Sequence, residues 1–391
     1  MVGEVQFPAF RNVSLPFTEP QARNLSEPAA VDEPADSFKP RGDVPGESAE
    51  RKAPAAPHGE AAAKKKPKSN KKSEPENNPP PPESAASPGN LIKIPLIHTN
   101  DLHGATRTLP AVEKVVERLK RVNPDAVLVD SGDAGNTANH GDPDRFGRIV
   151  EFFNKEGYTA VVPGNHEFQW GSGVAVKEYF KELKARVVSS NLLDKDTQKP
   201  ISGTVPYFIA DIKGVKVGFV GITTTKMHTP QHPEMGDDIT ALSESASLLK
   251  SVDEMRHEGA EVIVALVHKG ITDIKDEGSH LTEDYTLSDE EVQLSMEELK
   301  HLAAQVPYID VIVAGHDHKT ANAAFDTGPY PHKTYIVEAG SHGRQVGEID
   351  LYVDPVTRKV IDADMKVYPT RRYVVNAAEG SPAEAKGPDN A

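Results

Sequence analysis

Aspartate, histidine and asparagine recur in five short blocks of this sequence, and their oxygen and nitrogen atoms are suited to holding divalent metal ions. The blocks are Asp101-Leu102-His103, Gly132-Asp133, Gly164-Asn165-His166-Glu167, His268 and Gly315-His316-Asp317-His318. Each block alone is a weak signal, because a lone Asp or His is more often structural. Five blocks in order, each after a stretch that reads as a strand, predict a site for two metal ions.

Two of the blocks place their candidate ligands two residues apart. Asp101 and His103 follow one predicted strand, and His316 and His318 follow another. In an extended chain, residues two apart point to the same side, so both members of a pair can face one ion. Gly315 adds room for close approach of the backbone.

The stretches before the blocks have the apolar pattern of strands in an α/β fold. We expect strands at 91–97, 126–129, 160–162, 262–267 and 309–314, and helices near 111–122, 146–153, 242–257 and 292–304. The runs at 126–129 and 160–162 are continuously apolar, as in strands buried on both faces. This βαβαβ pattern predicts a sheet whose strand ends converge at one edge, where such folds build sites.

Strand patterns dominate the second half of the chain. A hairpin is expected at 207–212 and 215–222, and later strands at 335–337, 345–353 and 360–367. An acidic, polar insertion is expected at 271–295. We therefore predict an α/β fold with a two-sheet β-sandwich flanked by helices.

The first 90 residues have a different composition. They hold 16 of the 32 prolines and four Phe, with no Tyr or Trp, which predicts a disordered arm because little apolar surface can be buried. Six lysines between 64 and 72 could bind an anionic surface or act as a targeting signal, although a solvated linker is the simpler interpretation, and no partner is indicated. We expect domains at 1–90 (arm), 91–370 (catalytic) and 371–391 (flexible tail).

The charge and cysteine content narrow the classes of partner. The arm holds 12 basic and 13 acidic residues, so nearly all of the net charge of −15 lies in the rest of the chain, which argues against a nucleic-acid polymer as partner. The absence of cysteine excludes thiolate metal sites. We see no signal peptide near Met1 and no run that could span a membrane, which favours a cytoplasmic location.

Together the blocks resemble the calcineurin-like metallophosphoesterases. The words His98-Thr99-Asn100-Asp101, Gly164 to Phe168, Ser190-Asn191-Leu192 and Gly221-Ile222-Thr223-Thr224 resemble the 5'-nucleotidase and UDP-sugar hydrolase branch. The resemblance covers roughly residues 91–367, the catalytic part of that family, and implies its fold. Many relatives are exported, which leaves export open against the cytoplasmic expectation.

The resemblance also implies roles for individual residues. The first ion would be held by Asp101, His103, Asp133 and His318, and the second by the bridging Asp133 with Asn165, His268 and His316. Mn, Fe, Zn, Co or Ni would suit these ligands. A hydroxide between the ions would attack phosphorus, and the ions would clamp the phosphoryl oxygens. His166 would stabilise the transition state and protonate the leaving oxygen.

The chain departs from the family beside the catalytic imidazole. The 5'-nucleotidase branch has Asp at the position of Gln169, and other branches have an acid at the position of Asn136. An amide can orient an imidazole but stabilises its cation poorly, so we expect lower rates for esters with poor leaving groups. Glu167, Asp142 or Asp144 could supply the missing acid.

A second departure concerns substrate binding. The family's nucleotide-binding C-terminal domain has no counterpart in this sequence, so no aromatic pair is visible to stack a base. Candidate substrate contacts are Asn165, Trp170, Arg107 and Arg344, although packing for Trp170 and a solvated surface for the arginines are simpler interpretations.

Three functions remain open at this point. The first is metal-dependent hydrolysis of small phosphomonoesters, with nucleotides as candidate substrates. The second keeps the metals but cleaves phosphodiesters or pyrophosphates. The third is a metal-binding scaffold with weakened catalysis, which Gln169 favours and the seven intact ligand positions oppose.

Overall fold

The structure is a computed structural model, and it describes residues 90–104, 107–135, 146–228, 234–270, 289–327 and 332–373. By contacts the chain divides into two units, Met1–Asn78 and Pro79–Ala391, and every described residue lies in the second. The predicted arm and tail lie almost wholly outside the described residues, as do most of the predicted insertion and the acid positions Asn136, Asp142 and Asp144.

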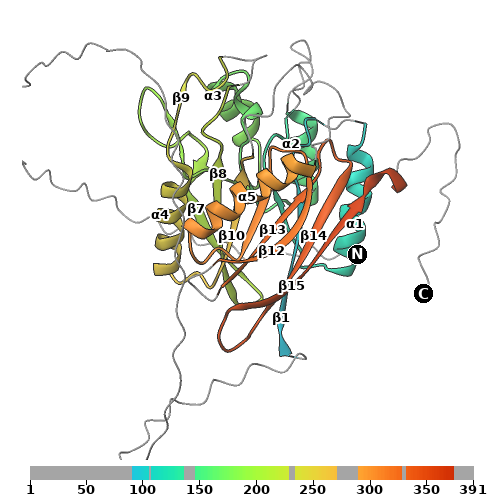
Figure 1. Cartoon of the computed structure of the whole chain (residues 1–391). Coiled ribbons are helices and arrows are strands. Elements are labelled where there is room, and N and C mark those ends of the chain that lie inside the picture. The colour runs from blue at the N-terminus through green and yellow to red at the C-terminus, as the bar shows by residue number, and fades with distance from the viewer. Residues whose placement is uncertain are drawn as a thin grey trace, which may run out of the picture. The chain divides into compact units, whose positions relative to one another are not determined.

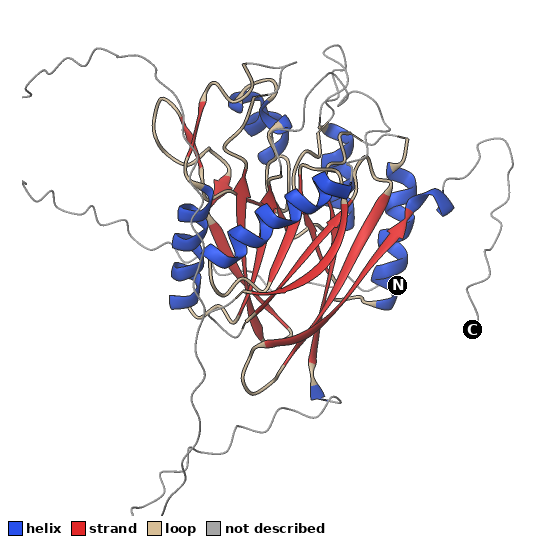
Figure 2. Cartoon of the chain, viewed as in Figure 1, coloured by secondary structure: helices blue, strands red, loops and turns tan. Residues whose placement is uncertain are grey.

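Two sheets form the centre of the second unit (Figures 1 and 2). The seven-stranded sheet has the order β15 (Val360–Pro369), β14 (Gln345–Val353), β1 (Ile92–Thr99), β2 (Val127–Asp130), β3 (Ala160–Val161), β4 (Arg186–Val188) and β6 (Thr204–Val205). The six-stranded sheet has the order β12 (Thr320–Asp326), β13 (Lys333–Ala339), β11 (Val311–Gly315), β10 (Val262–His268), β8 (Val215–Thr223) and β7 (Tyr207–Ile212). A separate pair joins β5 (Leu192–Asp194) to β9 (Ile239–Ala241).

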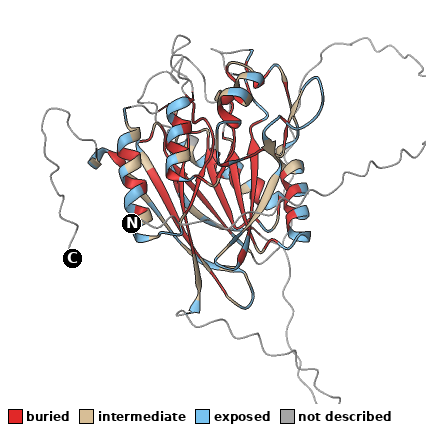
Figure 3. Cartoon of the chain, turned by 180° about the vertical axis from the view of Figure 1, so that it is seen from behind, coloured by how far each residue is buried: buried red, intermediate tan, exposed pale blue. Residues whose placement is uncertain are grey.

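Helices cover the outer face of each sheet. They are α1 (Leu109–Val122), α2 (Gly147–Glu156), α3 (Ser172–Ala175), α4 (Glu244–His257) and α5 (Asp289–Gln305), with short helical segments at His166–Phe168, Val176–Phe180 and Thr370–Tyr373. Helices α1, α2 and α3 pack on the seven-stranded sheet, and α4 and α5 pack on the six-stranded sheet. The outer faces of the helices are exposed and the strands between them are buried (Figure 3).

Strand β10 shows how the sequence builds these layers. Val262, Val264 and Leu266 pack between the two sheets. Ile263, Ala265 and Val267 pack against the helices on the other face. Side chains alternate across a strand, so a continuous apolar run is the pattern required of a strand with cores on both sides. His268, the last residue of β10, lies at the sheet edge, where the apolar run ends.

The α/β sandwich flanked by helices is therefore confirmed. Strands β1, β2, β3 and β4 pair in parallel, as do β8, β10, β11 and β13, while β7, β12, β14 and β15 add antiparallel edges. The predicted hairpin is β7–β8, and α5 begins at Asp289, three residues before the expected start. The sequence reading missed β4, β5, β6, β9 and β12, most of which have only two or three residues.

Candidate metal centre

The predicted metal ligands come together where strands of both sheets end. Asp101, Asp133 and Asn165 lie in the loops after β1, β2 and β3 of one sheet. His268 ends β10 and His316 follows β11 in the other sheet. Within each sheet these strands pair in parallel, β2 with β1 and β3 in one sheet and β10 with β11 in the other. Their carboxyl ends therefore lie at the same edge of each sheet, which is where α/β folds build sites.

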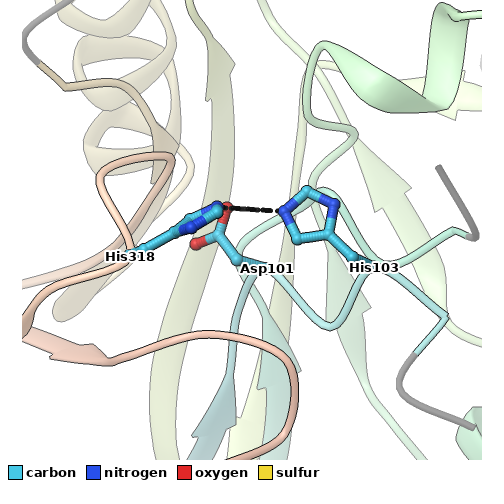
Figure 4. A group of neighbouring side chains, drawn as sticks. All are labelled: Asp101, His103 and His318. Atoms are coloured by element: carbon cyan, nitrogen blue, oxygen red, sulfur yellow. Dashed lines mark hydrogen bonds and ion pairs between the residues drawn. The ribbon is translucent and has the colours of Figure 1, made fainter. Parts of the chain in front are cut away.

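The first cluster consists of Asp101, His103 and His318, whose possible ligand atoms all lie within 4.8 Å of one another (Figure 4). The Nε2 atoms of His103 and His318 are 3.0 Å apart. Asp101 Oδ1 lies 3.9 Å from His103 Nε2 and 3.6 Å from His318 Nε2. Two imidazoles and a carboxylate that face a common point can hold one divalent ion.

The second cluster consists of Asp133, His268 and His316, and Asn165 joins it. His268 Nε2 lies 3.1 Å from Asp133 Oδ2 and 3.2 Å from Asn165 Oδ1. His316 Nδ1 lies 3.1 Å from the same Asn165 oxygen. The structure places Asp133 with this cluster, and its role as a bridge to the first cluster stays a prediction.

Burial keeps three of the imidazoles neutral. It holds the pKa of His103 well below the usual range, with the neighbouring His318 adding to the effect. Burial, followed by the effect of His268, lowers the pKa of His316 to about 4, and burial, followed by the effect of His342, lowers that of His318 to about 3. Because a metal ligand must be a neutral imidazole, these side chains are ready to bind at neutral pH.

The pKa values of the two buried aspartates, Asp101 and Asp133, are shifted in opposite directions. Burial acts to raise the pKa of Asp133, but His268 and His166 outweigh it and hold that pKa well below its usual range. In His268 burial acts to lower the pKa, but Asp133 outweighs it and the pKa rises to about 10. Burial raises the pKa of Asp101 well above its usual range. Metal binding displaces a proton from such a pair and stabilises a buried carboxylate, so the donors fit divalent cations.

The backbone at the site is held in an uncommon conformation. Five candidate ligands adopt the left-handed region, with φ of 50° at Asp101, 47° at His103, 53° at Asp133, 90° at His316 and 58° at His318. Each such residue costs on the order of 1–3 kcal/mol and persists only where the surrounding structure enforces it. Their concentration in one place points to a functional site.

Glu167 fixes the loops that carry Asp133 and Asn165. Its fully buried carboxylate accepts hydrogen bonds from four backbone N–H groups at 2.6–3.0 Å, those of Asp133, Ala134, Gly135 and Gly164. Gly164 is required in this arrangement, because a Cβ there would lie 2.1 Å from Asp133 Oδ1. Glu167 thus has a structural role, and the expectation that it could supply an acid beside His166 finds no support in these contacts.

His166 lies beside the first cluster and contacts the residue predicted to orient it. Its ring centroid is 5.3 Å from that of His103. Its Nδ1 lies 3.4 Å from Oε1 of the buried Gln169, and its backbone N–H donates to Asp133 Oδ1 at 2.8 Å. The half-buried imidazole is therefore held beside the first cluster, with a neutral amide as its partner.

The other predicted substrate contacts have different surroundings. Trp170 is half-buried and packs edge-on against Phe146, with ring centroids 6.2 Å apart, as expected of a packing residue. Arg107 and Arg344 are both exposed. Their roles in substrate binding stay predictions.

Sequence reasoning missed three residues that shape the site. Asn100 donates to Asp101 Oδ2 at 2.7 Å and to the carbonyl of Gly340 at 2.6 Å. The carbonyl of Ser131 lies 2.7 Å from His268 Nδ1, which directs Nε2 of that ring toward the ligands. His342 packs against the first cluster. Asn100 belongs to a motif quoted for the family resemblance, which gave it no role of its own, whereas Ser131 and His342 are indicated in the sequence only by the motif residues and glycines beside them.

Several known proteins resemble this chain over about two thirds of its length. The family model described as calcineurin-like phosphoesterase matches residues 94–320. Protein UshA of Yersinia enterocolitica is 27% identical over 287 residues, which are 66% of this chain and 48% of that protein. Human 5'-nucleotidase is 25% identical over 295 residues, 67% of this chain and 47% of that protein.

A solved structure has the same fold. The 5'-nucleotidase precursor of Thermus thermophilus superposes with a TM-score of 0.57 at 21% identity, over 71% of this chain and 54% of that one. The chain spans about half the length of the curated relatives it matches. Within the described residues, no helix is both long and apolar enough to cross a membrane. With more than half of its length matched by the family model, the chain belongs to the calcineurin-like phosphoesterases, in the branch that contains the 5'-nucleotidases and UshA.

Proposed function

We propose that this chain hydrolyses small phosphomonoesters with the help of two divalent metal ions. The observation that carries the proposal is the convergence of two clusters of oxygen and nitrogen donors, one from Asp101, His103 and His318 and one from Asp133, His268 and His316. Mn, Fe, Zn, Co and Ni all suit such donors. When bound, the ions polarise the phosphoryl oxygens and lower the pKa of the attacking water.

The side chains around the clusters provide positioning and proton transfer. Asn165 offers its amide oxygen to the second cluster and lies one residue before His166. His166, whose ring lies beside the first cluster, would donate a proton to the leaving oxygen of a bound ester. The Gln169 carbonyl oxygen accepts from the His166 Nδ1–H and keeps the ring in place.

The names of the relatives suggest a substrate class. Two similar proteins are called UshA and 5'-nucleotidase, so nucleoside monophosphates are the first candidates to test. Phosphodiesters and pyrophosphates are the alternative, since the same donors can serve either leaving group. A scaffold with weak catalysis is the remaining alternative, and the neutral Gln169 beside His166 is the contact that favours it.

The decisive experiment is metal reconstitution. Metal-stripped protein would be given Mn, Zn, Ni or Co separately and assayed on p-nitrophenyl phosphate and bis-p-nitrophenyl phosphate, with Asp133→Asn as the inactive control. Activity that requires both metal and Asp133 supports the hydrolase, and the preferred ester separates monoesterase from diesterase. Bound metal without hydrolysis of either ester would support the scaffold instead.

A further inference from the structure

A loop between β13 and β14 brings an additional histidine to the first cluster. The loop contains Gly340, Ser341, His342 and Gly343, and His342 adopts a left-handed backbone with φ of 53°. The ring of His342 lies 5.0 Å from that of His103 and 5.6 Å from that of His318, measured between centroids. Nothing in the family motifs discussed above assigns a role to this residue.

Hydrogen bonds hold this loop in register with the candidate ligands. The backbone N–H of His342 donates to the carbonyl of Asp101 at 2.7 Å, and the Thr108 hydroxyl donates to the carbonyl of His342 at 2.5 Å. Asn100 joins the Asp101 side chain to the carbonyl of Gly340. The side chain is directed as well, since His342 Nδ1 lies 3.0 Å from the Ser341 hydroxyl. Contacts of both the backbone and the side chain therefore fix the position of the His342 ring.

The geometry separates His342 from the ligands themselves. Ligands of one transition-metal ion bind at about 2.0–2.2 Å, so their donor atoms lie within roughly 4.4 Å of each other. Among the described residues, the first cluster of donor atoms within 4.8 Å of one another contains Asp101, His103 and His318 and does not include His342. His342 thus stands against two ligand rings but outside the set that can share the ion.

We propose that His342 is a substrate-binding residue that donates a hydrogen bond to a non-bridging oxygen of the phosphoryl group at the first cluster. This inference rests on the proposed function, since it needs a phosphate at the site. His342 is half-buried, so the residue is partly open to the solvent from which a substrate would approach. The same contact serves a phosphomonoester and the product, inorganic phosphate, because both present the same oxygens.

The test compares His342→Ala and His342→Gln with the wild type. The control is His257→Ala, which removes an exposed histidine at the end of α4. A lost hydrogen bond to a charged oxygen weakens binding about tenfold or more. We expect the KM for p-nitrophenyl phosphate and the inhibition constant for inorganic phosphate to rise about tenfold in His342→Ala and less in His342→Gln. The metal content should stay at the wild-type value, and His257→Ala should behave as the wild type.

Two results would overturn this role. Unchanged KM and phosphate inhibition in His342→Ala would show that the ring does not contact the phosphoryl group. Loss of one bound metal ion would show that His342 is a ligand.

Calorimetry with inorganic phosphate on the metal-loaded protein separates this proposal from the proposed activity. If the wild type binds phosphate but hydrolyses no ester, only the hydrolase fails, and weaker binding by His342→Ala still supports the contact. If the wild type neither binds phosphate nor hydrolyses an ester, both proposals are wrong.

Discussion

At the scale of single residues, the neutral partner of His166 is the feature with the clearest chemical consequence. Gln169 Oε1 lies 3.4 Å from His166 Nδ1, in a position from which a carboxylate would stabilise the imidazolium. The lack of that support should slow hydrolysis least when the leaving group departs as a stable anion. It should slow hydrolysis most when the leaving group must be protonated as it departs.

Gln169→Asp is therefore expected to raise kcat for an alkyl phosphate by about tenfold and to change kcat for p-nitrophenyl phosphate much less. Steady-state rates on the two esters, with the same metal bound, provide the measurement. The buried position makes Gln169→Asn the matched control for side-chain shortening without charge. Equal effects of the two substitutions on the alkyl phosphate would contradict the explanation by charge.

His98 gives a second prediction at this scale, for stability. It is fully buried on β1, and burial lowers its pKa from 6.5 to about 3. The unfolded chain therefore binds a proton below about pH 6.5 that the folded chain does not take up until about pH 3. The free energy of unfolding should fall as the pH drops through this window.

Replacing this ring tests the linkage. Urea unfolding of metal-free wild type and His98→Phe at pH 7.5 and pH 5 should show a smaller loss of stability in the variant. His257→Ala, which removes an exposed histidine, should leave the wild-type pH dependence unchanged. An identical loss in His98→Phe and wild type would mean that His98 does not carry this dependence.

At the scale of elements, a buried charge cluster ties the loop after β11 to α5 and β13. Lys319 Nζ lies 2.6 Å from Glu338 Oε2 and 3.4 Å from Asp317 Oδ2, and it donates to the Ser295 hydroxyl at 2.7 Å. The side chains of Lys319, Asp317 and Glu338 are at most 1% exposed. The loop that carries His316 and His318 is thus anchored through its own polar residues.

Lys319→Met should lower the free energy of unfolding by about 3–5 kcal/mol, because two buried carboxylates lose their cation. Chemical denaturation provides the measurement. Lys300→Met on α5, where the lysine is 44% exposed, should cost less than about 1 kcal/mol. If Lys319→Met lost as little stability as Lys300→Met, the buried charge cluster would contribute little to the free energy of unfolding.

The elements also show how much the sequence could predict. Long runs such as 262–267 and 215–222 identify their strands, because apolar residues there must fill cores on both sides. Strands of two or three residues carry too few side chains for a pattern, and β12 is made largely of small and polar residues. At the site, the blocks of candidate ligands can be recognised in the sequence because each follows a strand. The contacts of Asn100 and His342 depend on segments about 240 residues apart and leave no local signal.

At the scale of the whole molecule, the site is built from both sheets, so ions that bind there should stabilise the folded unit. Metal at about 100 times its dissociation constant adds roughly 2.7 kcal/mol per site. With both sites filled this is about 5 kcal/mol, so we expect Mn or Zn to raise Tm by roughly 10 °C over the chelator-treated protein, measured by calorimetry. Asp133→Asn should show a smaller increase, and an equal increase would place the bound ions elsewhere.

The distance along the chain between the two halves of the first cluster has a consequence for synthesis. His103 and His318 are separated by 215 residues, yet their Nε2 atoms meet at 3.0 Å. During translation the early half of the cluster leaves the ribosome long before the late half exists, and domains fold as units once their chain is available. An incomplete chain therefore cannot assemble this cluster, and any metal binding that depends on it would begin only when both sheets have folded.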